Sequence, residues 1–215
     1  LAVFGNRVVE PAGPLVDQAE VQVQLAFVRI EANRGLLVRD RVTEIRRLLP
    51  DTSVEVLIPD FKGSEGALRI VMESHPAILN HNLETAERLY RLARPGGRYD
   101  RALGLLANAR RMDPGALTKS GIILGMVVTC LPDLRRSDVN TVTLGQYLRP
   151  SERHLPVARY YTPDEFLELR ELGLEMGFTH VQSSPLTRSS YHAWEQAAAA
   201  RSGREFGRPH PGPGR

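Results

Sequence analysis

Cysteine and lysine are both scarce in this 215-residue sequence, which has one cysteine, Cys130, and two lysines, Lys62 and Lys119. A single cysteine excludes an intramolecular disulfide framework and fits a reducing compartment such as the cytoplasm. No run of about 18 apolar residues is present, so we expect no membrane-spanning helix. The sequence does not begin with Met and lacks the basic and apolar stretches of a secretory signal, so we expect a fragment or a processed chain without such a signal.

Neither sign of charge dominates the sequence. There are 28 Lys and Arg residues against 25 Asp and Glu, which gives a formal net charge of +3. A nucleic-acid interface would need a basic stripe with interleaved aromatic residues, whereas the arginines here are scattered among acids. We interpret them as solvated Arg–Glu helix faces and expect no nucleic-acid partner.

Hydrophobic periodicity predicts alternating strands and helices from residue 39 onward. Strands are expected at residues 53–58, 77–80, 118–125, 140–144 and 178–182. The strand-like alternation at residues 21–27 fits either an edge strand or a poorly packed extension. Helices are expected at residues 39–49, 64–74, 84–93, 99–112 and 162–176. Ser64 is suited to cap one of them, and Thr162 with Glu165 has the spacing of a capping box.

This alternation, with short loops rich in glycine and proline, indicates an α/β fold with a mostly parallel sheet. About five β/α units are present, which is too few for a closed eight-stranded barrel. The sequence is consistent with both a partial barrel and an open doubly wound sheet. In either fold the functional groups gather beyond the carboxyl ends of the strands. The polar loops at residues 59–63, 80–85, 145–150 and 188–191 are therefore the candidate site.

Several motifs occur in an order and at a spacing that resemble lipoyl synthases. The hallmark is Asn80-His81-Asn82-Leu83-Glu84-Thr85, and the carboxyl-terminal signature is Arg188-Ser189-Ser190-Tyr191. Matching segments also occur at residues 55–61, 94–99, 118–121, 143–156 and 176–180. The resemblance covers about residues 39–194. It divides the chain into a divergent segment (1–38), a lipoyl synthase-like partial barrel (39–200) and a tail expected to be disordered (201–215).

The resemblance implies a truncated, partial β/α barrel of the radical S-adenosylmethionine (SAM) type. It also implies the activity of that family, which inserts two sulfurs into a protein-bound octanoyl chain to make the lipoyl cofactor. The implied cofactors are [4Fe–4S] clusters and SAM, which carry the hard chemistry. The implied partners are octanoylated carrier domains, namely the E2 subunit of a 2-oxoacid dehydrogenase or the H protein of glycine cleavage, and the implied location is the cytoplasm.

The resemblance and the loop positions together suggest the site residues. Those expected to bind cofactor are Asn80, Asn82, Lys119, Gln146 and Arg188, and Ser190 is the serine that ligates the auxiliary cluster in the family. The five residues expected to bind cofactor should line one shared opening at the carboxyl ends of the strands, which we call the mouth. Asn80 and Asn82 could equally serve to close a turn after a strand.

The sequence also departs from the family. The cysteine sets that hold the two clusters are absent, and Cys130 does not lie at a family ligand position. Residues 125–132 stand where the family has a Gly-Leu-Gly-Glu-Thr loop and a following helix. Cys130 is better interpreted as a small buried hydrophobe, and His81 and His154 as hydrogen-bonded loop residues. Three interpretations remain: a truncated or divergent lipoyl synthase that is inactive alone, a non-catalytic module that binds octanoylated or lipoyl carrier domains, and a gene fragment without function.

Overall fold

The computed structural model describes residues 34–50, 52–124 and 129–187, together with three short strands nearer the amino terminus. Those strands are β1 (Val3–Phe4), β2 (Arg7–Val8) and β3 (Val23–Leu25). The elements that follow are α1 (Arg34–Leu48), β4 (Val54–Leu57), the 3₁₀ helix η1 (Phe61–Gly63), α2 (Glu65–Met72), β5 (Ile78–Asn80), α3 (Glu87–Ala93), α4 (Tyr99–Met112), β6 (Leu117–Leu124), α5 (Leu131–Arg136), β7 (Thr141–Gln146), α6 (Pro163–Glu175) and β8 (His180–Ser184). Within the described ranges, no helix is both long and apolar enough to cross a membrane.

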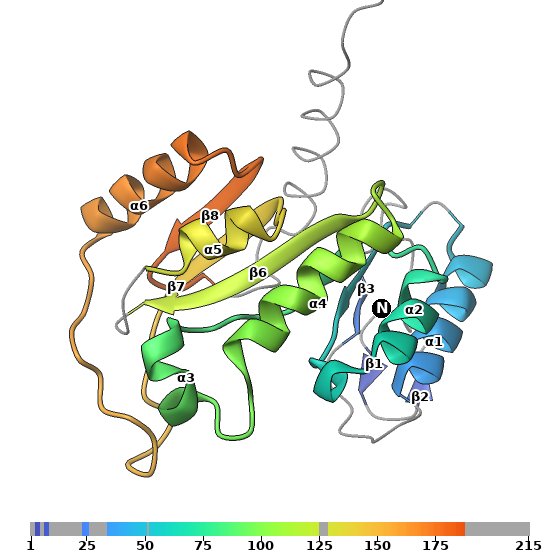
Figure 1. The fold of residues 1–215 in the computed structure, drawn as a ribbon, viewed down its shortest axis with the longest axis horizontal. Coiled ribbons are helices and arrows are strands. Elements are labelled where there is room, and N and C mark those ends of the chain that lie inside the picture. The colour runs from blue at the N-terminus through green and yellow to red at the C-terminus, as the bar shows by residue number, and fades with distance from the viewer. Residues whose placement is uncertain are drawn as a thin grey trace, which may run out of the picture.

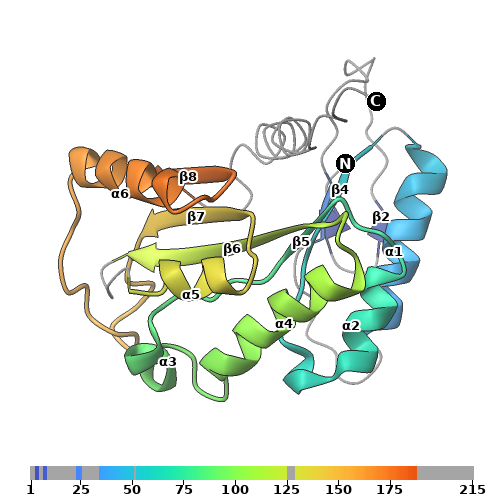
Figure 2. The same ribbon diagram turned by 45° about the horizontal axis from the view of Figure 1, so that its top comes forward.

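Six strands form one parallel sheet in chain order, β3-β4-β5-β6-β7-β8, while β1 and β2 pair antiparallel by themselves. Each connection between neighbouring parallel strands is expected to be right-handed, which places successive helices on the same face. The helices accordingly lie along one side of the sheet (Figures 1 and 2). This one-sided arrangement excludes the doubly wound alternative and confirms the predicted partial β/α barrel.

Side chains alternate between the two faces of each strand. The helix-facing positions include Val56, Leu79, Ile122 and Val142, which belong to one large buried core. The positions between them face away from the helices, and we name this side the inner face. It carries a separate small apolar cluster and a group of polar side chains that form the candidate site.

The predicted helix caps are confirmed. Ser64 Oγ accepts a hydrogen bond from the Ala67 N–H at 3.3 Å and begins α2. Thr162 and Glu165 form the reciprocal capping box that begins α6. That helix ends before Gly177, whose φ of +88° suits a residue without Cβ.

Some predicted boundaries are wrong. The helix expected from residue 84 begins at Glu87, because Glu84 has a left-handed φ of +69° and pairs with β6 instead. The helix expected to begin near residue 39 begins at Arg34, and the one expected to reach residue 74 ends at Met72. The short helix α5 was not predicted. Most of residues 1–38 and all of 201–215 lie outside the described residues, so the division into three segments stays a prediction.

Candidate functional site

A buried polar cluster lies on the inner face where β4, β5 and β6 run side by side. Glu55 Oε1 on β4 accepts a hydrogen bond from Asn80 Nδ2 on β5 at 2.8 Å. Lys119 Nζ on β6 lies 3.2 Å from the same carboxylate. Asn80 and Lys119 are direct partners in the β5–β6 register. One carboxylate thus joins two of the predicted site residues, which are 39 positions apart in the sequence.

Burial sets the electrostatics of this cluster. Lys119 is fully buried and Glu55 is 8% exposed. Burial lowers the pKa of Lys119, and the negative charge and hydrogen bond of Glu55 oppose that change. An ammonium group buried without a carboxylate is costly. Glu55 is therefore the residue that allows a positive charge inside the partial barrel.

Asn82 lies close to this cluster because Gly121 leaves room for it. A Cβ on Gly121 would lie 2.8 Å from Asn82 Oδ1 and 3.1 Å from Thr143 Oγ1. The Oδ1 atoms of Asn80 and Asn82 are both buried, and neither accepts a hydrogen bond from the described residues. Buried acceptors of this kind are normally satisfied. The inner face therefore suits a ligand that donates O–H or N–H hydrogen bonds.

The segment after β5 runs along β6 and fixes the backbone of Asn82. The Glu84 N–H donates to Gly121 O at 2.8 Å, and the Ile123 N–H donates to Glu84 O at 2.9 Å. Arg94 Nη1 donates to Asn82 O at 2.5 Å. These bonds hold the main chain at Asn82 and at Glu84, so the position of the Asn82 side chain does not depend on a ligand.

His81 behaves as a structural residue. It is buried, and its Nδ1 lies 2.8 Å from Ile58 O, which requires Nδ1 to carry the proton. Burial lowers the pKa of His81 to about 4, so the ring is neutral at physiological pH. The prediction of a hydrogen-bonded loop histidine agrees with this geometry. His154 likewise contacts Ser151 Oγ at 2.9 Å.

The loop between β4 and α2 has an unusual backbone at the same edge of the sheet. Phe61, Lys62 and Gly63 are consecutive residues with φ of +47°, +53° and +86°, which is strained for the first two. Asp60 holds the turn, since its Oδ1 accepts from the Lys62 N–H at 3.0 Å and its Oδ2 accepts from Arg101 Nε at 2.7 Å. Burial would raise the pKa of Asp60, but these two donors outweigh it and lower the pKa.

Gln146, at the end of β7, bonds to a different part of the chain. Its Nε2 donates to Tyr147 O at 3.1 Å and to Arg159 O at 3.2 Å. Its Oε1 accepts from the Tyr161 N–H at 3.0 Å. These bonds close the loop between β7 and α6. The β6–β7 register pairs Lys119 with Thr141, five residues before Gln146.

The structure therefore brings together Asn80 and Lys119, with Asn82 beside Gly121, whereas Gln146 lies further along the strands and holds a loop. Arg188 and Ser190 lie outside the described residues. Cofactor binding by each of these residues stays a prediction. Sequence reasoning missed Glu55. Its signal was a single carboxylate inside the apolar strand at residues 53–58, since a charge buried in a strand needs a partner.

The described residues do not fit a [4Fe–4S] cluster. They contain no group of three His, Cys, Asp or Glu side chains placed to hold a metal ion. Cys130 is fully buried, and burial raises the pKa of its thiol to about 12. A cysteine that ligates a cluster must do so as a thiolate. The prediction that Cys130 packs as a small hydrophobe is confirmed.

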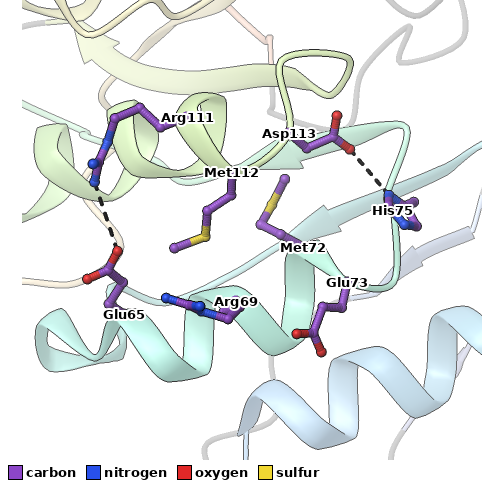
Figure 3. Close-up of a pocket in the computed structure, with 8 residues that line it drawn as sticks. All are labelled: Glu65, Arg69, Met72, Glu73, His75, Arg111, Met112 and Asp113. Atoms are coloured by element: carbon purple, nitrogen blue, oxygen red, sulfur yellow. Dashed lines mark hydrogen bonds and ion pairs between the residues drawn. The ribbon is translucent and has the colours of Figure 1, made fainter.

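A pocket of about 450 Å³ lies elsewhere, on the outer surface between α2 and α4 (Figure 3). Its lining mixes both charges, including Arg69, Glu73 and Arg111, around the thioethers of Met72 and Met112. These residues lie near the carboxyl ends of their helices, and those ends lead back to the amino ends of the strands. The pocket is therefore at the opposite edge of the sheet from the mouth.

Comparisons with known proteins give a consistent result. A scan against protein-family models gives no match. The chain is 52% identical over 168 residues to a lipoyl synthase of Rubrobacter xylanophilus, covering 75% of this chain and 52% of that protein. It is 51% identical over 162 residues to a lipoyl synthase of Koribacter versatilis, covering 73% of this chain and 53% of that protein. A lipoyl synthase of Bacillus cytotoxicus is 48% identical over 168 residues, covering 75% of this chain and 56% of that protein.

A structural comparison supports the fold. The crystal structure of methylornithine synthase matches with a TM-score of 0.54 at 16% sequence identity, covering 79% of this chain and 58% of that one. At this identity the match concerns the fold alone. The chain spans about half the length of the curated relatives it matches. Over the matched three quarters of its own length, the chain belongs to the lipoyl synthase family.

Proposed function

We propose that the inner face of this sheet binds SAM and the octanoyl chain in the lipoyl synthase reaction. That reaction inserts two sulfurs into an octanoyl group carried by a protein domain. The observation that carries the proposal is the pair of buried acceptors, Asn80 Oδ1 and Asn82 Oδ1, beside the Glu55–Lys119 ion pair. A cytoplasmic location is part of the same proposal and rests on the family.

The residues of the inner face fit SAM better than they fit a cluster. SAM offers ribose hydroxyls, an ammonium group and an adenine amino group, all of which can donate hydrogen bonds to the asparagine oxygens. Glu55 and Lys119 provide one charge of each sign for the amino-acid end of such a ligand. When bound, SAM would supply a 5′-deoxyadenosyl group, which becomes a radical only with an electron from a reduced cluster. The residues of this chain would position the ligand and exclude water from it.

The [4Fe–4S] cluster needs thiolates that the described residues do not offer, as shown for Cys130. The described residues therefore support no reaction step through a cluster. The same observation favours a second candidate function, a module that binds the octanoylated carrier domain without turning it over. Iron–sulfide reconstitution, described below, separates the two.

Isothermal titration of the chain with SAM tests the proposal. We expect saturable binding, weakened about fivefold by Asn82→Ala, because one hydrogen bond is worth about 1 kcal/mol. Asn108→Ala is the matched control, since Asn108 lies on α4 and contacts Arg111 rather than the inner face. Absence of SAM binding, or equal loss in both variants, would refute the proposed site.

A further inference from the structure

Four exposed arginines lie at the rim of the sheet, near the carboxyl ends of the strands. Arg88 and Arg91 are on α3, and Arg149 and Arg153 are on the loop between β7 and α6. That loop passes beside α3 in both ribbon views (Figures 1 and 2). We name these four residues the rim arginines. They lie at the end of the sheet where the strands finish and do not belong to the polar cluster described above.

The rim arginines differ from neighbouring arginines in having no carboxylate partner. Arg98 pairs with Asp100 at 2.8 Å, and Arg159 pairs with Glu165 at 2.7 Å. None of the four rim arginines forms an ion pair with any carboxylate in the part of the chain that the structure describes. Two exposed acids, Glu87 and Glu152, lie in the same segments. Positive charge therefore exceeds negative charge at this rim.

Large apolar side chains are exposed among the rim arginines. Leu92 on α3 is 64% exposed, and Tyr160 on the β7–α6 loop is 67% exposed. Arg88 and Leu92 are four residues apart on one helix and so share a face. Arginine and tyrosine are enriched at protein interfaces. Exposed apolar side chains beside unneutralised charge fit a surface that binds another protein.

We propose that the rim arginines, with Leu92 and Tyr160, dock an acidic face of the protein domain that delivers the octanoyl chain. This inference rests on the proposed function, because that function requires an acyl chain attached to a protein. The uncompensated positive charge selects an acidic partner. The position at the carboxyl ends of the strands places the partner where its acyl arm can enter the inner face. Nucleic acid fits less well, because single strands bind on platforms of several aromatic residues.

The test is binding of a fluorescently labelled octanoylated E2 lipoyl domain, measured by anisotropy at 50 and 300 mM NaCl. For the double variant Arg91→Glu with Arg153→Glu, we expect a dissociation constant at least about tenfold higher at low salt, with a smaller salt dependence. The matched control is Arg69→Glu with Arg111→Glu, which makes the same charge change at the outer pocket. We expect the control to stay within about twofold of wild type.

The outcomes separate this inference from the proposed function. If the wild-type chain binds the carrier and the rim variant binds equally well, or no worse than the control, the docking surface is refuted while the partner stands. If the wild type binds no carrier, the proposed partner fails, whereas SAM titration still tests the inner face. Tighter binding of a single-stranded oligonucleotide than of the carrier, lost in the rim variant, would overturn the assignment to a protein. Circular dichroism and thermal melting confirm that each variant is folded.

Discussion

Replacing Glu55 by Gln tests the buried ion pair directly. The substitution preserves shape and leaves an oxygen for Asn80 Nδ2, but it removes the negative charge 3.2 Å from Lys119 Nζ. Lys119 is fully buried and Glu55 nearly so, which means that solvent screens the pair little. Removing one partner of such a pair typically costs 3–5 kcal/mol. We expect a loss of about 3 kcal/mol in the free energy of unfolding at pH 7.

This loss should depend on pH with a definite sign. Folding lowers the pKa of Lys119, whereas in the unfolded chain a lysine has a pKa of about 10.4. In the alkaline range below that unfolded pKa, the unfolded chain therefore binds more protons than the folded chain. Stability conferred by this group therefore rises with pH in that range. The rise should be steeper in Glu55→Gln, because the charge that opposes desolvation is gone.

Urea unfolding at pH 7, 8.5 and 9.5 provides the assay. With a slope of about 2 kcal/mol per molar urea, the expected loss moves the midpoint by about 1.5 M at pH 7. Glu168→Gln, an exposed change on α6, is the control and should stay within about 0.5 kcal/mol. Adding Lys119→Met to Glu55→Gln should restore most of the stability. A wild-type midpoint for Glu55→Gln at pH 7, or a loss that does not vary with pH, would refute the reasoning.

Three further predictions concern Gly121, Cys130 and the clusters. Gly121→Ala should displace Asn82, lower the free energy of unfolding by about 1 kcal/mol and weaken SAM binding. Its control, Gly104→Ala, has open space around the added Cβ and should stabilise α4 by up to about 1 kcal/mol. Equal shifts of the two variants in thermal melts would contradict this prediction. Iodoacetamide at pH 8 should alkylate Cys130 on the order of a thousandfold more slowly in the folded chain than in urea, because burial raises the pKa of the thiol to about 12; similar rates would show that the thiol is accessible. Anaerobic reconstitution with iron and sulfide should yield no stoichiometric cluster. Cluster absorbance, together with release of 5′-deoxyadenosine in the presence of dithionite, SAM and an octanoylated carrier, would show that the chain does assemble an active cluster.

The elements that sequence predicted best are those whose signals are local. The helix expected at residues 99–112 was found with those bounds, because Pro95-Gly96-Gly97 precedes it and Asp113-Pro114-Gly115 follows it. The capping box at Thr162 fixed the start of α6 for the same reason. Such signals depend on residues within one turn, so tertiary contacts do not override them.

The features that sequence missed depend on contacts between distant segments. Glu84 would suit a helix, but its backbone pairs with β6 nearly forty residues later and takes a left-handed conformation. Glu55 reaches Lys119 across 64 residues, and only the strand register makes the two meet. Gln146 is a polar residue at the end of a strand, as a site residue would be, yet its side-chain amide forms hydrogen bonds to the loop that follows. Local pattern cannot distinguish these cases, because the competing partners are defined only by the folded sheet.

The Gln146 clamp has a consequence for how the loop between β7 and α6 can vary among relatives. One side chain joins the two ends of the loop, at Tyr147 and at Arg159 and Tyr161. Once the ends are held, lengthening the segment between them adds little closure entropy, about 0.6 kcal/mol for each doubling of length. Insertions and deletions near Ser151 can therefore accumulate without disturbing the sheet. A gene family could in this way alter the surface beside the mouth, and with it the choice of partner, while the interior of the barrel stays unchanged.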